Sequence, residues 1–440
     1  MEHSASPCLH FCFFFICPPC AEGGGSLGLL LLLLRRRRRR RQRYLSFLVP
    51  LSRTRSLPPS SRLLRRSFPA QLWQGTPTHN QPHQPFPVPF RLPAGISHLA
   101  FFPLADRLVL AAGDKDGHVG VWDVTRPPHD DEERGEEDSE VDAARAPAGG
   151  GASDGVLLFR PHGQYVSGLV PCRGRLFTSS YDGTVRCLDP AGGVFAEVRR
   201  SCGPGGREFS AMDVSEGVGG LALLLGDNQG GLTRLDARDP ASSSPSSPSP
   251  SCEFDGLHHK KINTVSVDPE RGHLFATSST DGNVSVWDLR RLSLAGPTPV
   301  ARLAHAKSCQ AAYWSPAGCG ARRLLTTCYD DRLRVWDDPS SSSSDPGPPP
   351  SPTLSIRHDH NTGRWVLPFR AAWSPAGDGI LCGSMTRQVG LFGAGPGSSG
   401  ETLAAHQSGY LTAIPSRVAA HPEMPAVAGA TASGRVAVFR

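Results

Sequence analysis

One short pattern occurs seven times between residues 116 and 440, and it constrains the fold of this chain more than any other feature. In each copy a tight polar turn precedes an alternating strand that ends in an aromatic or aliphatic residue, often followed by Asp. The copies are Asp116–Asp123, Asp182–Asp189, Gln229–Asp236, Asp281–Asp288, Asp330–Asp337, Thr386–Gly393 and Ser433–Arg440. Their first residues are 66, 47, 52, 49, 56 and 47 positions apart. Repeats of this kind, with Gly in the turn and Trp-Asp at the strand end, are typical of four-stranded propeller blades. We therefore predict an all-β fold, a seven-bladed WD-repeat β-propeller.

Two further strands are expected before each turn. In the fourth copy, residues 262–267 alternate and end at Asp268-Pro269, and residues 274–278 then lead into the turn. The same arrangement occurs at residues 96–102, 311–315 and 369–374. Proline closes such a strand because it has no N–H for the ladder, and Gly in the two-residue turn is expected at positive φ.

Three tryptophans, Trp122, Trp287 and Trp336, lie near the strand ends of their copies. We expect them to pack between blades, with each indole N–H donating to a neighbouring hydroxyl group such as that of Thr277 or Ser278. The last copy ends at Arg440, on its third strand. We expect residues near 87–92 to add the fourth strand and so remove an open sheet edge.

The first 85 residues differ in composition from the rest. A short Leu-rich run is followed by seven arginines at residues 35–41, and Pro-rich sequence continues to about residue 89. The apolar run is too short to span a membrane, and its position before the arginines is the reverse of a signal peptide. Two interpretations stay open: low-complexity sequence, or a basic tail for nuclear import or nucleic-acid contact. We predict a disordered, Arg/Pro-rich segment at 1–85 and the propeller at 86–440, with polar loop insertions at 127–153, 239–255 and 338–353.

The formal net charge of +6 is unevenly distributed. Residues 1–80 carry 13 Arg against two Glu, whereas residues 130–142 carry nine acidic residues and one Arg. The rest of the propeller is only weakly basic. Any nucleic-acid binding must therefore come from local basic clusters.

One face of the predicted ring collects candidate DNA-binding residues. Because neighbouring strands are antiparallel, the first strand of a blade begins on the face where the second strand ends and the tight turn lies; we call this the turn face. The candidates on it are Lys115, Lys260, Lys261, Arg364 and Trp365. Lysine and arginine would contact phosphates, and the tryptophan would stack on a base or wedge between steps. The alternative is solvated charges and a tryptophan packed against its own loop.

No constellation of residues indicates an enzyme. The sequence has no nucleophile elbow, no metal-spaced His cluster and no phosphate-binding loop. His258, His259 and His305 precede first strands, where we expect hydrogen bonds within the blade. Cys17 and Cys20 have no second pair with which to hold zinc. We predict a non-enzymatic protein without catalytic residues, metal, cofactor, small-molecule substrate or membrane partner.

Six passages resemble the family of WD repeat-containing protein 76, nuclear propellers related to the small, damage-sensing subunit of the ultraviolet-damaged-DNA-binding complex. They are residues 111–123, 157–169, 179–189, 305–316, 324–337 and 356–375. In the wider family, a hairpin at the position of Gly363-Arg364-Trp365 enters DNA at a lesion, and lysines matching Lys115 and Lys261 contact the backbone. The damage sensor has Phe-Gln-His where this chain has Gly-Arg-Trp, so the resemblance does not imply the same lesion specificity. It implies DNA, damaged or carrying modified cytosine, and chromatin proteins as partners.

The sequence Trp287-Asp288-Leu289-Arg290 is similar to the WDxR box by which many propellers dock on the adaptor of cullin-4 ubiquitin ligases. Arginine supplies a planar, rigid donor for which lysine would not substitute. The same letters follow partly from the repeat itself, so a purely structural role stays open. The resemblance thus implies a nuclear DNA- or chromatin-binding protein, linked to the DNA damage response and acting as a substrate receptor for such a ligase. The alternative is a protein scaffold that binds peptides or histone tails without DNA contact.

Overall fold

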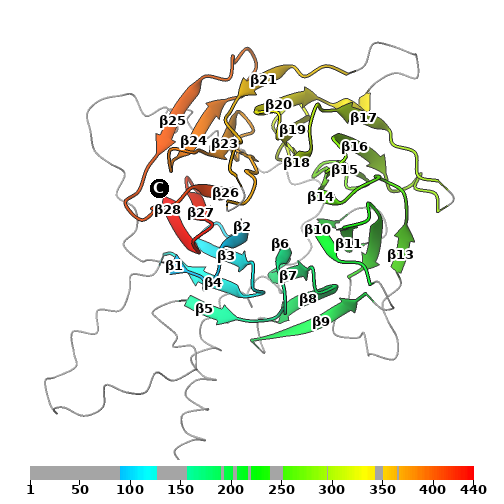
Figure 1. Cartoon of the computed structure of the whole chain (residues 1–440), viewed down its shortest axis with the longest axis horizontal. Coiled ribbons are helices and arrows are strands. Elements are labelled where there is room, and N and C mark those ends of the chain that lie inside the picture. Colours follow the sequence, from blue (N-terminus) through cyan, green and yellow to red (C-terminus); the bar gives the residue numbers. More distant parts are fainter. Residues whose placement is uncertain are drawn as a thin grey trace, which may run out of the picture.

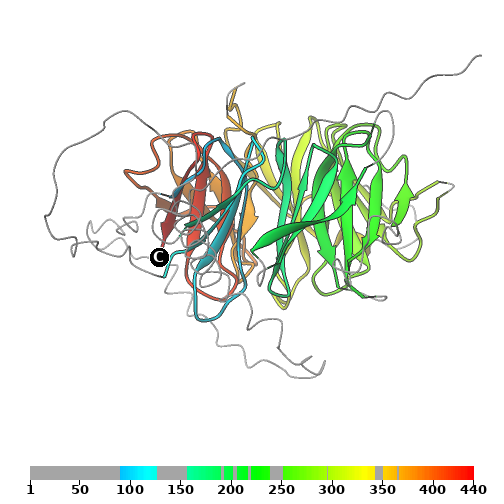
Figure 2. The same cartoon turned by 90° about the horizontal axis from the view of Figure 1, so that it is seen from below.

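The computed structural model describes residues 90–125, 156–189, 193–201, 206–216, 220–237, 251–294, 296–341, 350–363 and 366–440. These residues form seven four-stranded antiparallel sheets that stand around a central axis (Figure 1). In the perpendicular view the strands run between two faces of the ring (Figure 2). The predicted seven-bladed propeller is confirmed. The predicted disordered segment 1–85 and the predicted insertion 127–153 lie outside the described residues.

Six blades take their strands from consecutive stretches of the chain. Blade 1 consists of β2 (Ile96–Phe101), β3 (Val109–Asp114), β4 (Val119–Asp123) and β5 (Val156–Phe159). Blade 2 consists of β6 (Val166–Cys172), β7 (Arg175–Ser180), β8 (Thr184–Asp189) and β9 (Val194–Arg200). Blade 3 consists of β10 (Phe209–Ser215), β11 (Ala222–Asp227), β12 (Leu232–Asp236) and β13 (Ser251–Phe254). Blade 4 consists of β14 (Ile262–Val267), β15 (Leu274–Ser279), β16 (Asn283–Asp288) and β17 (Ala301–Ala304). Blade 5 consists of β18 (Cys309–Trp314), β19 (Arg323–Cys328), β20 (Arg332–Asp337) and β21 (Leu354–Arg357). Blade 6 consists of β22 (Ala372–Trp373), β23 (Gly379–Gly383), β24 (Val389–Gly393) and β25 (Thr402–His406). A 3₁₀ turn, η3 (Pro339–Ser341), follows β20.

Blade 7 is closed by a strand from the other end of the propeller. Its sequence-adjacent strands are β26 (Pro415–Ala420), β27 (Val427–Thr431) and β28 (Arg435–Phe439), and its outer strand is β1 (Phe90–Arg91). In the register, Phe90 is opposite Val436, and the Leu92 N–H then donates to the Gly434 carbonyl at 2.9 Å. Leu92 is buried in the core between blades 1 and 7. The predicted closure by residues near 87–92 is confirmed.

The tight turns have the expected backbone. The second turn residue has φ between 61° and 93° in all seven blades: Gly117, Gly183, Gly230, Gly282, Asp331, Arg387 and Gly434. Glycine adopts this left-handed region without steric cost, and Asp tolerates it better than most residues. In blade 4, the Asp281 carboxylate accepts the Asn283 N–H at 2.8 Å and so caps the turn.

Trp287 confirms the predicted role of the tryptophans. It is fully buried in a core that includes Leu224 and Leu232 of the preceding blade. Its indole Nε1–H donates to the Thr277 hydroxyl at 2.7 Å, and that hydroxyl lies 2.7 Å from Nε2 of His258. Nδ1 of His258 lies 3.0 Å from the Asp281 carboxylate. Trp287, Thr277, His258 and Asp281 thus form one continuous hydrogen-bonded chain, in which each polar group has a partner.

Trp336 repeats the arrangement in blade 5. Its Nε1–H donates to the Thr326 hydroxyl at 3.1 Å, and Nε2 of His305 lies 3.0 Å from the same oxygen. Trp122 packs between blades 1 and 7 in the same manner. The expected hydrogen bonding of His258 and His305 within their blades is confirmed.

A β-bulge near the start of the first strand supports the ring from blade to blade. The register of the first strand skips one residue in six blades, at Ser97, Ser167, Ser210, Asn263, Gln310 and Ser416. In blades 1 to 4 the skipped side chain donates to the carbonyl at the start of the next blade: to Val166, Phe209, Ile262 and Cys309. We call these bonds the bulge clasps. They hold neighbouring first strands at a fixed distance around the channel.

The structure differs from the predicted boundaries in blades 6 and 3. The first strand of blade 6 was expected at 369–374, yet β22 covers Ala372–Trp373 alone. Pro368, in the stretch before β22, has no N–H to donate to a neighbouring strand. The backbone of Arg370 forms an isolated parallel β-bridge with Arg417 of blade 7 and does not pair with β23. The predicted insertion 239–255 contains β13, because its last residues pair with β12.

No helix among the described residues is long and apolar enough to cross a membrane.

Candidate nucleic-acid interface

The predicted DNA-binding lysines lie on the turn face but not in one cluster. Lys115 follows β3 in blade 1, and Lys260 and Lys261 precede β14 in blade 4, well apart around the ring (Figure 1). Lys260 is exposed, whereas Lys115 and Lys261 are half-buried. These side chains would contact separate parts of a large ligand. Arg364 and Trp365 lie outside the described residues.

The fourth lysine of the chain also lies on the turn face. Lys307 is exposed and precedes β18, which begins at Cys309 and not at the expected residue 311. The sequence prediction included only Lys115, Lys260 and Lys261 on this face. All four lysines of the chain therefore lie on the turn face.

Lys261 points to a pair of stacked tyrosines. Its Nζ lies 3.5 Å from the Tyr181 hydroxyl oxygen and 5.9 Å from the ring centroid. The Tyr181 ring stacks on Tyr165, with centroids 4.8 Å apart and an interplanar angle of 24°. Burial lowers the pKa of Lys261, and nearby Arg370 lowers it further; burial also raises the pKa of Tyr181 to about 12. The site thus presents a cation beside aromatic rings, which is the combination that single-stranded bases and phosphates use.

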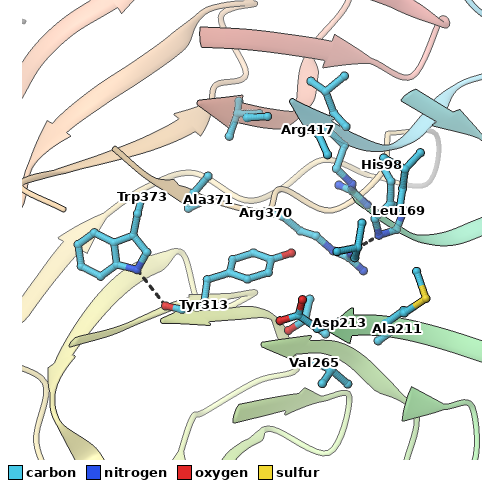
Figure 3. A pocket seen from close by; sticks show the side chains of 18 of the residues that line it. His98, Leu169, Ala211, Asp213, Val265, Tyr313, Arg370, Ala371, Trp373 and Arg417 are labelled. Carbon is cyan, nitrogen blue, oxygen red and sulfur yellow. Dashed lines mark hydrogen bonds between the residues drawn. The ribbon is translucent and has the colours of Figure 1, made fainter. Parts of the chain in front are cut away.

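Arg370 spans the central channel (Figure 3). One guanidinium nitrogen lies 2.9 Å from Nε2 of His98 in blade 1, and the other donates to the Asn263 carbonyl in blade 4 at 2.8 Å. Nδ1 of His98 lies 3.0 Å from the Val166 carbonyl, so it carries the hydrogen and leaves Nε2 to accept from Arg370. Burial, Arg370 and Arg417 all lower the pKa of His98, which is therefore neutral.

Arg417 is a second buried guanidinium beside the channel. It donates to the Ser97 and Pro368 carbonyls, each at 2.5 Å, and so joins blade 7 to blade 1 where no bulge clasp does. Burial lowers its pKa, and repulsion from Arg370 adds to the effect. Within the described residues, neither arginine has a carboxylate within salt-bridge distance. Two positive charges with neutral acceptors create a positive potential at this end of the channel.

The channel itself is a cavity of about 410 Å³, lined by the first strands of all seven blades. Asp213 of β10 supplies a carboxylate to its wall, away from the start of the strand. Its oxygens accept the backbone N–H groups of Val214 at 2.8 Å and Val267 at 2.7 Å. Burial nevertheless raises the pKa of Asp213 to about 6. The channel could admit a side chain or a single base, but not a duplex.

Two of the aspartates at the neighbouring turns are paired with arginine, whereas Asp182 and Asp281 bond histidines. The Asp227 carboxylate lies 2.9 Å from Arg207, and the Asp330 carboxylate lies 2.6 Å from Arg334. These charges cancel locally. They therefore subtract little from the positive potential of Arg370, Arg417 and the lysines.

The predicted adaptor-binding residues lie on the opposite face, at the end of β16. Trp287 is fully buried and Asp288 is nearly so, whereas the Arg290 side chain is 60% exposed. The Asp288 carboxylate holds the guanidinium through Nε at 3.0 Å and Nη2 at 2.7 Å. The Trp287 indole is enclosed in the core between blades, so Arg290 is the one of the three predicted residues that presents an exposed side chain. Asp288 can act only by orienting Arg290.

Sequence reasoning missed His98, Tyr165, Tyr181, Arg370 and Arg417 as members of this face. His98 and Arg417 hold the same position, directly after the skipped residue of a first-strand bulge. A search for polar side chains at the third position of each first strand would have found them. No sequence pattern marks Arg370, because it precedes the shortened strand β22.

These features define the chain as a WD-repeat β-propeller with an aromatic and cationic turn face. The family model "WD domain, G-beta repeat" matches residues 251–288. Among solved structures, the β-propeller domain of Cps50 (Swd1) from Myceliophteria thermophila matches with a TM-score of 0.57 at 14% identity, over 80% of this chain and 98% of that one. At this identity the likeness concerns the fold alone.

Curated relatives make the resemblance more specific. WD repeat-containing protein 76 of Mus musculus is 34% identical over 78% of this chain and 49% of its own length. The protein of the same name from Rhinolophus ferrumequinum is 33% identical over the same shares. DNA damage-binding protein cmr1 of Neurospora crassa is 28% identical over 79% of this chain and 65% of its own length. The resemblance predicted from the sequence is confirmed, and the chain spans about half the length of the first two relatives.

Proposed function

We propose that this chain is a non-enzymatic nuclear protein that binds DNA with its turn face and takes part in the response to DNA damage. The observation that carries the proposal is the pair Arg370 and Arg417. Within the described residues, every hydrogen-bond acceptor of these two arginines is uncharged, and both stand beside the Tyr165–Tyr181 stack. The printed names of the fungal relatives, DNA damage-binding proteins, support it.

Each group on the face has a distinct part in the proposed complex. Lys115, Lys260 and Lys307 would neutralise phosphates along the rim, since duplex DNA is too wide for the channel. Arg364 and Trp365 would enter the duplex in the way that the matching hairpin does in the wider family that the sequence resembles. A base displaced in this way would meet tyrosine rings and guanidinium groups at the channel mouth. Damaged DNA is a proposed target because a damaged base leaves the stack at lower cost. DNA with modified cytosine is a second proposed target, which rests on the resemblance alone.

Salt-dependent binding of duplex DNA tests the proposal. We expect the triple variant Lys260→Glu, Lys261→Glu, Trp365→Ala to bind more weakly and to flatten the plot of log K against log salt by about 1, since the loss of the Lys260 phosphate contact removes about 0.9. Arg290→Ala, on the opposite face, is the matched control and should keep the wild-type slope. An unchanged affinity and slope in the triple variant would exclude DNA binding by this face.

We further propose that Arg290 docks on the adaptor of a cullin-4 ubiquitin ligase, so that the chain serves as a substrate receptor. Support comes from its exposed guanidinium, held in one orientation by Asp288, on the face away from the DNA. We expect Arg290→Ala and Arg290→Lys to lower adaptor co-purification from nuclei severalfold without changing the melting temperature. Equal recovery with Arg290→Ala would remove the ligase half of the proposal.

A protein scaffold is the second candidate, and the size of the channel favours it. A cavity of about 410 Å³ suits a peptide side chain. The arginines favour acidic peptides over basic histone tails. Retention on DNA resin compared with arrays of acidic and basic peptides distinguishes the two candidates: peptide binding without DNA retention would replace the DNA proposal.

A further inference from the structure

Three potential metal ligands meet in the core between blades 5 and 6. His358 and His360 follow β21, and Cys382 belongs to β23. They are 8%, 2% and 0% exposed. One nitrogen of each imidazole and the Cys382 sulfur lie within 4.8 Å of one another. Histidine and cysteine are the ligands that soft metal ions select.

The backbone fixes both histidines in this position. The N–H of His358 donates to the Asp331 carbonyl at 3.0 Å, and the N–H of His360 donates to the Asp331 carboxylate at 2.9 Å. Asp331 is itself held in the left-handed conformation of the tight turn, with φ of 61°. The two rings therefore face the same space, with centroids 4.7 Å apart.

The hydrogen bonds of the rings leave two nitrogen lone pairs free. Nδ1 of His360 lies 2.5 Å from the Cys328 carbonyl, so it carries the hydrogen and leaves Nε2 as a lone pair. His358 forms its backbone hydrogen bond with Gly383. Among the described residues, Nδ1 of His358 and Nε2 of His360 have no hydrogen-bond partner. Metal-ligating histidines use this arrangement, in which the other ring N–H is fixed by a carbonyl group.

Blade 6 lacks the hydrogen bonds between histidine, hydroxyl group and tryptophan that blade 5 has. His305 in blade 5 bonds the Thr326 hydroxyl, which accepts from Trp336. Registers of the second and third strands place Cys382 where blade 5 has Thr326, and Phe392 where it has Trp336. Blade 6 thus has a thiol in place of the hydroxyl and a phenyl ring in place of the indole. A buried polar group without a partner costs about 1–3 kcal/mol, so two such nitrogens need another explanation.

We propose that His358, His360 and Cys382 bind one monovalent copper ion in a three-coordinate site. The thiol loses its proton to solvent as the sulfur–copper bond forms, so the thiolate and Cu⁺ together are neutral in an apolar core. The surroundings fit a neutral site, since Phe369 and Phe392 pack edge-on against His358 with centroids at 5.5 Å and 5.8 Å. A zinc ion would leave one net positive charge buried and would lack its fourth ligand.

The protonation of the ligands agrees with this assignment. Burial lowers the pKa of His358 to about 4, with a further contribution from His360, and burial lowers the pKa of His360. Burial thus favours the neutral form of both imidazoles, which is the form that binds metal. Burial raises the pKa of the Cys382 thiol, so copper has to displace its proton. Binding should accordingly release one proton per ion.

Copper titration of the full chain tests the site. Cys17 and Cys20 are changed to Ser in every sample to remove the one Cys-x-x-Cys pair, and Cu⁺ is supplied anaerobically in competition with a chromogenic Cu⁺ chelator. We expect one ion per chain, a sulfur-to-copper absorption band in the ultraviolet, and a rise in melting temperature on loading. X-ray absorption should give one sulfur and two nitrogen neighbours.

Cys382→Thr is the decisive variant, because it restores the residue that blade 5 has at this position. We expect it to fold with equal or higher stability without metal and to lose the ion, the absorption band and the copper-dependent rise in melting temperature. Cys309→Ser, at another buried cysteine, should keep all three. Equal copper in Cys382→Thr and the parent would overturn the site, and tight Zn²⁺ binding at one ion per chain with weaker Cu⁺ binding would overturn the copper assignment.

Discussion

At the scale of single residues, one hydroxyl group in blade 4 and one in blade 5 each stabilise both an indole and an imidazole. In blade 4 that group belongs to Thr277, which contacts Trp287 and His258. Thr277→Val keeps the shape but leaves both partners unpaired, so we expect the free energy of unfolding to fall by about 3 kcal/mol. Urea denaturation measures the change, and Thr277→Ser, which keeps the hydroxyl, should stay close to wild type. Equal losses in the two variants would show that packing, not hydrogen bonding, is responsible.

The buried carboxyl of Asp213 gives the fold a pH dependence. Burial raises its pKa from the ordinary value of 3.8 to about 6, despite two backbone N–H donors. The folded protein therefore holds this proton more tightly than the unfolded chain, and the stabilisation is lost as pH rises from about 4 through about 6. Asp213→Asn cannot titrate. We expect the free energy of unfolding of wild type, relative to that variant, to fall by about 3 kcal/mol over this window. Denaturation at several pH values measures it; a constant difference would contradict the assignment, and Asp106→Asn, at an exposed aspartate, is the control.

The sequence predicts which face a residue lies on better than it predicts the direction of its side chain. Lys261 was correctly placed on the turn face from strand polarity, yet its amino group turns inward to Tyr181. Arg370 reaches blades 1 and 4 from blade 6, and no spacing along the chain encodes such a contact across the channel. Contacts between blades depend on the closed ring, whereas strand polarity is local.

At the scale of the element, β1 is the shortest strand of blade 7 and the only one from the other end of the propeller. We expect a chain that starts at residue 93 to melt several degrees below one that starts at residue 90, because it lacks β1 and the buried Leu92 and exposes the edge of β28. Differential scanning calorimetry on the two truncations checks the prediction. Equal melting temperatures would show that β1 does not support the ring, and the truncation at residue 90 controls for the loss of everything before it.

Strands were predictable from the sequence where turn residues and alternation agree. Ile262–Val267 matches β14 to the residue, since apolar alternation ends there at Asp268-Pro269. Prediction failed at β13, whose four residues Ser251–Phe254 directly follow a Ser/Pro-rich run and are too few to set a pattern; they pair with β12, which lies beside them. It also failed at β22, where the interactions of Arg370 replace ladder pairing. Outer and irregular strands depend on tertiary partners that local pattern does not record.

At the scale of the whole molecule, the two proposed binding sites lie on opposite faces of a rigid ring. Arg290 and the arginine pair of the channel share no partner, so their effects on binding should add. We expect Arg290→Ala to leave DNA affinity within twofold of wild type, and the triple variant of Lys260, Lys261 and Trp365 to leave adaptor binding unchanged. Titration of one ligand in the presence of a saturating amount of the other measures the coupling. A tenfold effect of either ligand on the other would show that the faces are not independent.

The pairing of β1 with β28 also sets the order in which the protein can be completed. During synthesis Phe90 leaves the ribosome before the rest of the described propeller, and its partner Val436 leaves among the last of the propeller residues. β1 therefore stays unpaired while six blades are made. A two-residue strand offers almost no edge on which a nascent neighbour could pair wrongly. The brevity of β1 thus protects the waiting end during synthesis, and the ring acquires its final shape only when translation of the last strand is over.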